Sequence, residues 1–404
     1  MKTTSFWKSG HTPTLFAAFL YFDLNFMVWV LLGPLAVQIS KDLGLSAAQK
    51  GLMVATPLLA GALLRIVMGV LVDHLKPKKA GVIGQVVVLG SLCWAWLGHL
   101  QNYGSLLALG MLLGTAGASF AVALPLASRW YPPEHQGTAL GIAGAGNSGT
   151  AFAALFAPSL AIALGWQNVF GLCLVPVGIA FAVYLLFAKD APSAPSAKPL
   201  ADYLQVLKDK DAWWFMFFYS VTFGGFSGLA SSLTIYFNMQ YGLPAATAGY
   251  FTAACVFAGS MVRPLGGRLA DRAGGITALS LMYAVAASAL FIASLGLQSA
   301  IAAVCVFVLA MLALGAGNGA VFQLVPQRFR DEIGVMTGLV GMAGGVGGFY
   351  LASSLGYSKQ LTGSYQFGLT MFAALAAAAL LALTMVKARW CATWGSAAMA
   401  SARI

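Results

Sequence analysis

Long apolar runs alternate with short polar breaks along almost the whole chain. Each apolar run has about 20 residues or more, the length that a helix needs to cross the ~30 Å hydrocarbon core of a bilayer. The breaks collect glycine, proline and charged residues. The pattern therefore predicts an all-α membrane protein with twelve transmembrane helices. The expected spans are residues 13–38, 49–73, 80–98, 104–128, 137–162, 167–188, 211–237, 246–270, 276–296, 299–325, 334–356 and 366–387.

One polar segment divides the twelve runs into two sets of six. Residues 189–210 are rich in alanine, proline, serine and charge, which predicts a surface linker. We therefore expect an N-terminal six-helix half at 1–188 and a C-terminal half with a short tail at 211–404. The first apolar run extends from about residue 15 to 37, beyond the roughly 7–15 residues of a signal-peptide core, and we interpret it as a span.

Composition supports a membrane protein and excludes several other classes. The chain is 60% hydrophobic and 8% charged, with a mean hydropathy of +0.83, whereas soluble domains carry about 25% charged residues. The net charge of +11 is spread over short loops, so it indicates no nucleic-acid partner. The five cysteines are single and no nucleophile–base set occurs. We therefore expect neither a metal site nor a cofactor, and we do not expect an enzyme.

The basic residues indicate how the chain crosses the membrane. If the N-terminus is cytoplasmic, 17 lysines and arginines lie in cytoplasmic segments, 3 lie in segments on the other side and 2 lie within spans. Cytoplasmic loops of membrane proteins carry such an excess of positive charge. Both termini are therefore expected in the cytoplasm, with the chain in the cell (inner) membrane.

The two halves repeat one pattern of glycine, arginine and aspartate. At an offset of 198, Gly61, Arg65, Gly69 and Asp73 recur as Gly259, Arg263, Gly267 and Asp271. Three glycines of the fifth span also recur in the eleventh at an offset of 197: Gly137, Gly141 and Gly144 as Gly334, Gly338 and Gly341. This parallel repeat resembles the major facilitator fold, in which two six-helix halves surround a site near the midplane.

The loop that follows Gly69 resembles the major facilitator signature between the second and third helices. Its acid, Asp73, and the repeated acid, Asp271, could cap a helix end or pair with basic residues and so close the cytoplasmic side. Alternatively, they only mark solvated loops.

Two arginines are expected deep within spans. Arg65 lies about 16 residues into the second span, and Arg263 occupies the matching place in the eighth. An arginine at the bilayer centre costs roughly 2.5–3.5 kcal/mol on insertion scales, so it marks a functional site by default. Of the eleven acids, only Asp23 lies in the interior of a span, since the others stand at span ends or in loops, and one carboxylate cannot neutralise two arginines. The pair therefore predicts an anion site, although purely structural arginines are the alternative. The guanidinium fork matches planar oxyanions such as nitrate.

Two glycine-rich stretches narrow the choice of anion. Residues 141–149, with Gly144 and Gly146, and residues 341–349, with Gly341 and Gly344, resemble the paired signatures of the nitrate/nitrite porter family. The opening segment 22–29 and the two arginines extend the resemblance over most of the chain. The compact linker is closer to the bacterial assimilatory members than to the long-looped eukaryotic ones. The resemblance implies a secondary transporter of nitrate or nitrite.

The resemblance also implies roles for single residues. In this family the anion lies between the two arginines and between aromatic rings, which here implicates Arg65 and Arg263. The further candidates are Asn147 as a polar contact, Tyr219 and Phe223 on one face of the seventh span, Phe120 as the opposing ring, and Phe322. Packing in the core or against lipid is the alternative for each aromatic residue. In the second half the position of Asn147 is taken by Gly344, so we expect the polar contact from the N-terminal half alone.

The energy source for transport stays open at this point. Asp23 could carry a coupling proton, or it could hydrogen-bond neighbouring helices without titrating. Proton-coupled uptake and nitrate/nitrite exchange are both compatible with the sequence, as are import and export. We expect a monomer in the lipid bilayer. The other classes considered are a porter for another small anion or drug, an anion channel and an anion sensor.

Overall fold

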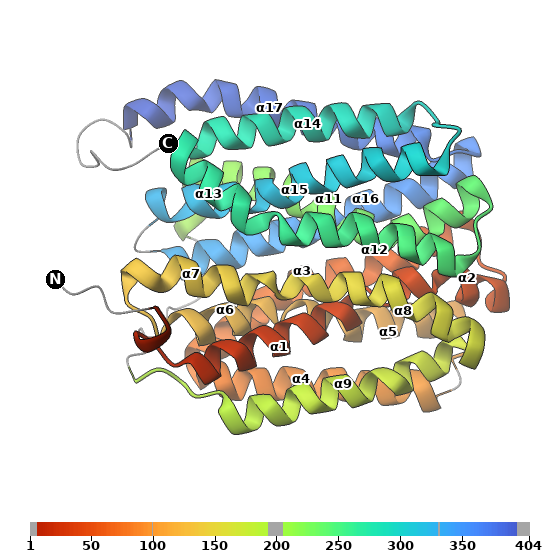
Figure 1. Cartoon of the computed structure of the whole chain (residues 1–404), viewed down its shortest axis with the longest axis horizontal. Coiled ribbons are helices and arrows are strands. Elements are labelled where there is room, and N and C mark those ends of the chain that lie inside the picture. Colours follow the sequence, from red (N-terminus) through yellow and green to blue (C-terminus); the bar gives the residue numbers. More distant parts are fainter. Residues whose placement is uncertain (1–5, 99, 193–204, 330–331, 394–404) are drawn as a thin grey trace.

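The computed structural model describes residues 6–98, 100–192, 205–329 and 332–393. Within these ranges the secondary structure consists of helices, and no strand occurs. Figure 1 shows long helices running side by side, with the N-terminal helices below and the C-terminal helices above. The described chain begins and ends at the same end of this bundle. Most of the predicted linker, residues 193–204, lies outside the described residues.

Nine α-helices and two 3₁₀ helices make up the described N-terminal part, residues 6–192. They are η1 (Phe6–Lys8), α1 (Thr12–Trp29), α2 (Leu32–Leu43), α3 (Ala47–Leu75), α4 (Pro77–Leu97), α5 (Tyr103–Gly117), α6 (Phe120–Ser128), α7 (Pro133–Gly144), η2 (Ala145–Ser148), α8 (Gly149–Leu164) and α9 (Trp166–Phe187).

The described C-terminal part, residues 205–393, has fewer and longer helices. They are α11 (Lys210–Tyr241), α12 (Ala245–Met261), α13 (Arg263–Ala273), α14 (Gly275–Ser294), α15 (Ala300–Arg328), α16 (Ile333–Thr362) and α17 (Gln366–Thr393).

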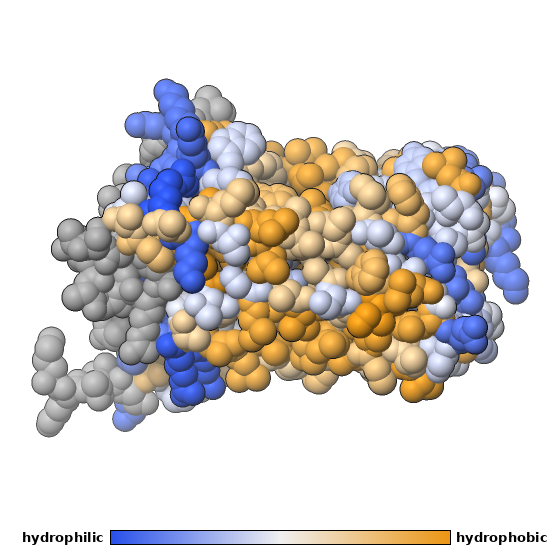
Figure 2. All heavy atoms as spheres, turned by 90° about the horizontal axis from the view of Figure 1, so that it is seen from above, coloured by the Kyte–Doolittle hydropathy of each residue, from blue (hydrophilic) through white to orange (hydrophobic). Residues whose placement is uncertain are grey.

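Eleven segments of the described chain are long and apolar enough to cross a membrane. They coincide with eleven predicted spans, each usually a few residues longer than expected, and the protein is a multi-pass membrane protein. Figure 2 shows the matching surface, an apolar belt between two hydrophilic ends.

The seventh predicted span, α11, is not among these eleven segments. Its 32 residues would extend about 48 Å, which is ample for crossing. It carries many glycines, serines and threonines, and nearly all of its middle section is buried inside the protein. Because a helix surrounded by other helices needs no lipid-facing apolar side, hydropathy underrates it. The seventh span, and with it the total of twelve, stays a prediction.

Several spans are interrupted near their middle, and the interruptions position the site. The span of α5 and α6 breaks at Ala118 and Ser119, and the span of α7 and α8 passes through η2. The span of α12 and α13 breaks at Val262, directly before Arg263. Pro264 contributes to this last break, because proline has no N–H for the helical hydrogen bond. Such breaks are tolerated at membrane depth where they are buried in protein or line a cavity.

The N-terminal and C-terminal helices meet through small residues. A Cβ atom at Gly51 of α3 would lie 2.7 Å from the Cα of Gly356 in α16, and a Cβ at Gly345 would lie 2.7 Å from the Cβ of Ala62. A Cβ at Gly33 of α2 would overlap the main chain of Ser231 in α11. These glycines allow close backbone approach, as small residues do in membrane helices generally.

Candidate functional site

Arg65 lies at the centre of the protein, in α3, and its side chain is buried. Its Nε donates to the carbonyl of Gly117 at 3.2 Å, and its Nη1 donates to the carbonyl of Gly341. The first acceptor ends α5 and the second belongs to α16. One guanidinium group thus joins the N-terminal helices to the C-terminal helices.

Aromatic rings surround the same guanidinium on several sides. Its central carbon lies 5.3 Å from the ring centroid of Trp29, 5.2 Å from that of Phe120 and 5.1 Å from that of Phe223. Cation–π attraction at these distances stabilises the charge, and the rings exclude water. The structure therefore brings the predicted Phe120 and Phe223 to Arg65.

Arg263 lies at the start of α13 and is half-buried. Its guanidinium carbon is 5.9 Å from the ring centroid of Phe322 in α15. The Phe322 ring is 5.0 Å from the Tyr219 ring, edge to face, and 6.2 Å from the Phe120 ring. Phe322 thus lies near Arg263 on one side and near Phe120, one of the rings around Arg65, on the other.

Tyr219 and Phe223 lie one turn apart on α11, with parallel rings whose centroids are 5.2 Å apart. The i, i+4 spacing places both on one face of the helix, as the sequence predicts. The charges of Arg65 and Arg263 both act on the Tyr219 hydroxyl, and the two guanidinium groups act on each other. The hydroxyl lies close to Arg263 without the geometry of a hydrogen bond.

Buried polar atoms without partners are the most informative feature of the site. Unpaired buried polar atoms each cost about 1–3 kcal/mol, and more when the group is charged. Neither arginine forms an ion pair with any residue that the structure describes. Among the described residues, no hydrogen-bond partner is found for Arg65 Nη2, Arg263 Nη1, the Tyr219 hydroxyl or either amide atom of Asn147. The arrangement offers several donors and uncompensated positive charge, which an anion would satisfy.

Asn147 belongs to η2, the 3₁₀ interruption in the predicted fifth span. Its carbonyl accepts from the Thr150 hydroxyl at 2.7 Å and from the Ser260 hydroxyl of α12 at 3.5 Å. A Cβ at the neighbouring Gly146 would lie 2.5 Å from the Phe22 ring, so glycine allows α1 to approach. By contrast, a Cβ at Gly144 would meet nothing within 4 Å, so close packing does not account for that glycine.

The second glycine-rich stretch lies directly against the site. A Cβ at Gly344 would lie 2.7 Å from the Tyr219 ring and 2.9 Å from the Phe223 ring. A Cβ at Gly341 would lie 3.6 Å from both Arg65 and Phe120, an ordinary contact. An asparagine side chain does not fit at position 344, which explains why the second half has no counterpart of Asn147.

Asp23 is buried in α1, and it pairs with neither arginine. Its carboxylate accepts a hydrogen bond from the Ser148 hydroxyl at 2.7 Å and another from the backbone N–H of Gly149. These donors end η2 and begin α8, next to Asn147. Asp23 therefore stabilises η2, the 3₁₀ interruption that contains the candidate anion contact Asn147.

The acids of the repeated signature lie away from this site. Asp73 forms an ion pair with Arg129 at 3.4 Å, near the end of α6, and both side chains are partly exposed. Asp271 is exposed on α13. The pairing of Asp73 with a basic residue has the form that the sequence suggests, while a role in closing the cytoplasmic side stays a prediction.

Trp29 and Gly117 are site residues to which the sequence assigns no role. The Trp29 indole donates to the Pro57 carbonyl at 2.7 Å, which holds its ring beside Arg65. Gly117 contributes only a main-chain carbonyl. A tryptophan in an apolar run carries no local sign of its partner, and a carbonyl carries no side-chain signal at all.

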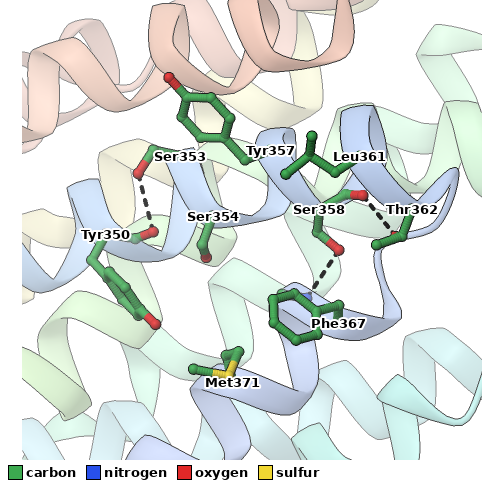
Figure 3. A pocket seen from close by; sticks show the side chains of 10 residues that line it. Tyr350, Ser353, Ser354, Tyr357, Ser358, Leu361, Thr362, Phe367 and Met371 are labelled. Carbon is green, nitrogen blue, oxygen red and sulfur yellow. Dashed lines mark hydrogen bonds between the residues drawn. The ribbon is translucent and has the colours of Figure 1, made fainter.

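A groove at the surface is separate from this centre. It has a volume of about 390 Å³ and lies along α16 and α17 (Figure 3). Its serine and threonine hydroxyls bond to nearby main-chain groups, as Ser353 does with Phe349 at 2.6 Å. It contains no charged side chain among its lining residues, so it does not resemble an anion site.

Comparisons with known proteins identify the family of this chain. A family model described as the Major Facilitator Superfamily matches residues 15–352. The chain is 32% identical over 380 residues to the "Probable nitrate/nitrite transporter NarK2" of Mycobacterium tuberculosis, covering 93% of this chain and 95% of that protein. It is 31% identical to the "Nitrite extrusion protein" of Bacillus subtilis, with 90% of each chain covered.

Two further matches extend the comparison. The "Probable nitrate/nitrite antiporter NarK1" of Thermus thermophilus is 29% identical, over 92% of this chain and 91% of that protein. Among solved structures, an inward-facing bacterial homologue of the lysosomal transporter Spinster matches 94% of this chain and 97% of that chain. Its TM-score is 0.70 at 20% identity, which shows the shared fold. The chain belongs to the major facilitator superfamily and, within it, to the nitrate/nitrite porter family.

Proposed function

We propose that this protein is a secondary active transporter that moves nitrate, nitrite or both across the membrane by alternating access. The observation that carries the proposal is the set of unpaired buried donors around two arginines that have no carboxylate partner among the described residues. The names of the relatives, which include a nitrate/nitrite transporter and a nitrite extrusion protein, support the choice of anion.

The unpaired atoms suit a small planar oxyanion. Arg65 Nη2 and Arg263 Nη1 provide charged donors, and Tyr219 and Asn147 provide neutral ones. Arginine binds planar anions through its rigid fork, and it keeps its charge when buried. The rings of Phe120 and Phe223 exclude water around the anion and so strengthen each of these interactions.

Residues from both parts of the chain contribute to this site, as alternating access requires. Arg65 and Asn147 belong to the N-terminal helices, whereas Arg263 and Tyr219 belong to the C-terminal ones. Rocking of one set against the other would change the bond between Arg65 and Gly341. A bound anion would bridge the two sets during this motion, which links binding to the change of access.

Two coupling mechanisms follow from the position of Asp23. As a proton carrier it would drive anion uptake, and its bonds to Ser148 and Gly149 would transmit protonation to Asn147. Alternatively, Asp23 keeps these hydrogen bonds throughout and never takes up a proton. Transport would then be the exchange of nitrate for nitrite. The two mechanisms differ in their response to an imposed pH gradient.

The cellular setting of the proposal follows from charge and family. We propose an inner-membrane location with both termini in the cytoplasm, since 17 basic residues lie on that side and 3 on the other. We further propose a monomer in which the halves 1–188 and 211–404 move against each other around the linker 189–210. Asp73 and Asp271 would stabilise the closed cytoplasmic side.

Counterflow in proteoliposomes tests the proposal. Vesicles loaded with unlabelled nitrate or nitrite should accumulate labelled nitrate from outside, and chloride or sulfate inside should not support this accumulation. The matched control is Arg263→Lys, which keeps the charge but loses the planar fork. Labelled nitrate entering these control vesicles as fast as the parental ones, or no counterflow with the parental protein, would contradict the proposal.

A further inference from the structure

Asn318 of α15 is a second fully buried asparagine with unpaired amide atoms. Neither its oxygen nor its nitrogen has a hydrogen-bond partner in the part of the chain that the structure describes. Asn25 differs, because its Nδ2 donates to Tyr21 and Gln85 at 2.7 Å each and only its Oδ1 has no partner among the described residues. An amide without partners in an apolar interior is unfavourable, because its hydrogen bonds to water are lost and not replaced, so Asn318 requires an explanation.

Contacts of the neighbouring residues place Asn318 beside Arg263. Phe322 follows it by four residues on the same face of α15, and the Phe322 ring lies at Arg263 and Tyr219. A Cβ at the next residue, Gly319, would overlap the carbonyl oxygen of Arg263. The helix therefore touches the main chain of Arg263 at the level of Asn318.

The internal repeat gives the same placement independently. Gly315 of α15 packs against Gly259, just as Gly114 of α5 packs against Gly61, and these partners correspond in the repeat. Proline follows each packing glycine by eleven residues, at 326 and 125. This register pairs Asn318 with Gly117, the residue whose carbonyl accepts from Arg65 Nε. Asn318 thus occupies beside Arg263 the place that Gly117 occupies beside Arg65.

The two arginines differ in how the protein holds them. Arg65 donates to two main-chain carbonyls. Arg263 makes no such bond within the described residues, and its Nη1 is buried without a partner. An asparagine carries both an acceptor and two donors, so it can serve a guanidinium and an anion at once.

We propose that Asn318 is an anion-binding residue of the same site. Its amide nitrogen donates to the bound oxyanion, and its amide oxygen accepts from Arg263 and orients that guanidinium. This inference rests on the proposed function and extends it, because the sequence comparison of the two halves predicts no polar contact from the C-terminal half opposite Asn147. The site then has one asparagine from each half.

The test uses two variants of the full-length protein. Asn318→Leu keeps the branched shape and the number of side-chain heavy atoms while removing both polar atoms, and Asn318→Gly introduces the residue found at the corresponding position 117. In each, nitrate and nitrite affinity should fall about 10- to 100-fold, since a hydrogen bond to a charged ligand is lost. Ligand-free Tm of Asn318→Leu should stay level or rise, because unpaired buried atoms are removed. Affinity is measured from nitrate-induced Tm shifts and from the KM of counterflow.

A matched control separates a ligand contact from a structural one. Asn238 lies in α11, and its Nδ2 donates to the Leu243 carbonyl at 2.8 Å. Asn238→Leu should lower the ligand-free Tm and leave nitrate affinity unchanged, the opposite pattern. If the parental protein responds to nitrate and both Asn318 variants respond at the same concentrations, the Asn318 proposal is overturned while the proposed function stands. If the parental protein responds to neither anion, both are overturned.

Discussion

Arg65 donates a hydrogen bond to the main-chain carbonyl of Gly341, 276 residues further along the chain. The bond joins α3 to α16, the pair of helices that also pack closely through Gly51 and Gly356. A Cβ atom at Gly341 would meet Arg65 and Phe120 only at 3.6 Å, so this main-chain bond does not depend on the missing side chain. A residue proposed to bind the cargo is thus also a contact between the two sets of helices.

Replacing either arginine by lysine should abolish anion binding. Lysine keeps the positive charge but cannot form paired contacts with a planar anion. Losing two charge-assisted hydrogen bonds predicts at least about a 100-fold weaker nitrate Kd for Arg65→Lys and for Arg263→Lys. Binding to purified protein is measured by calorimetry, with the size-exclusion profile as the control for folding. Well-folded variants that bind nitrate with parental affinity would show that the arginines are structural.

Single neutral contacts should matter less than an arginine. Asn147→Ala and Tyr219→Phe each remove one neutral partner of a charged ligand, on the order of 1.5–3 kcal/mol. The expected nitrate Kd is therefore roughly 10- to 100-fold higher in each variant. The same calorimetric assay checks both. An unchanged Kd in both variants would assign Asn147 and Tyr219 to packing.

Two glycines of the eleventh predicted span should differ in their tolerance of a methyl group. Gly344→Ala places a Cβ 2.7 Å from Tyr219 and 2.9 Å from Phe223, so these rings must move. Gly341→Ala meets Arg65 and Phe120 only at 3.6 Å. We expect the KM for nitrate counterflow to rise at least about tenfold in Gly344→Ala and less than about threefold in Gly341→Ala, since overpacking costs about 1–3 kcal/mol. Equal KM values would argue against the ring positions described above.

Asp23→Asn distinguishes the two coupling mechanisms. Asparagine imitates the protonated acid, and its amide oxygen can still accept from Ser148. If Asp23 carries the coupling proton, the variant should bind and exchange nitrate but should not concentrate it under an inward proton gradient. Uptake is measured in vesicles with an imposed pH gradient, beside nitrate/nitrite exchange without one. Gradient-driven uptake at the parental rate would eliminate Asp23 as the carrier and favour simple exchange.

Eleven of the predicted spans are confirmed because crossing a bilayer is a local property of the sequence. About twenty apolar residues and a polar break suffice to specify a span, whatever the rest of the chain does. The same rule fails for α11, whose polar residues point into the protein and not toward lipid. Its place in the bundle depends on neighbours that hydropathy does not consider.

The sequence by itself determined the helical membrane class, the repeat and the unusual positions of Arg65, Arg263 and Asp23. Charge within an apolar run is expensive wherever the helix packs, so it is visible without a structure. Only the tertiary structure decided which groups meet those charges. Trp29 and the carbonyls of Gly117 and Gly341 come from three separate helices. Their roles arise where helices break and pack, which no local pattern encodes.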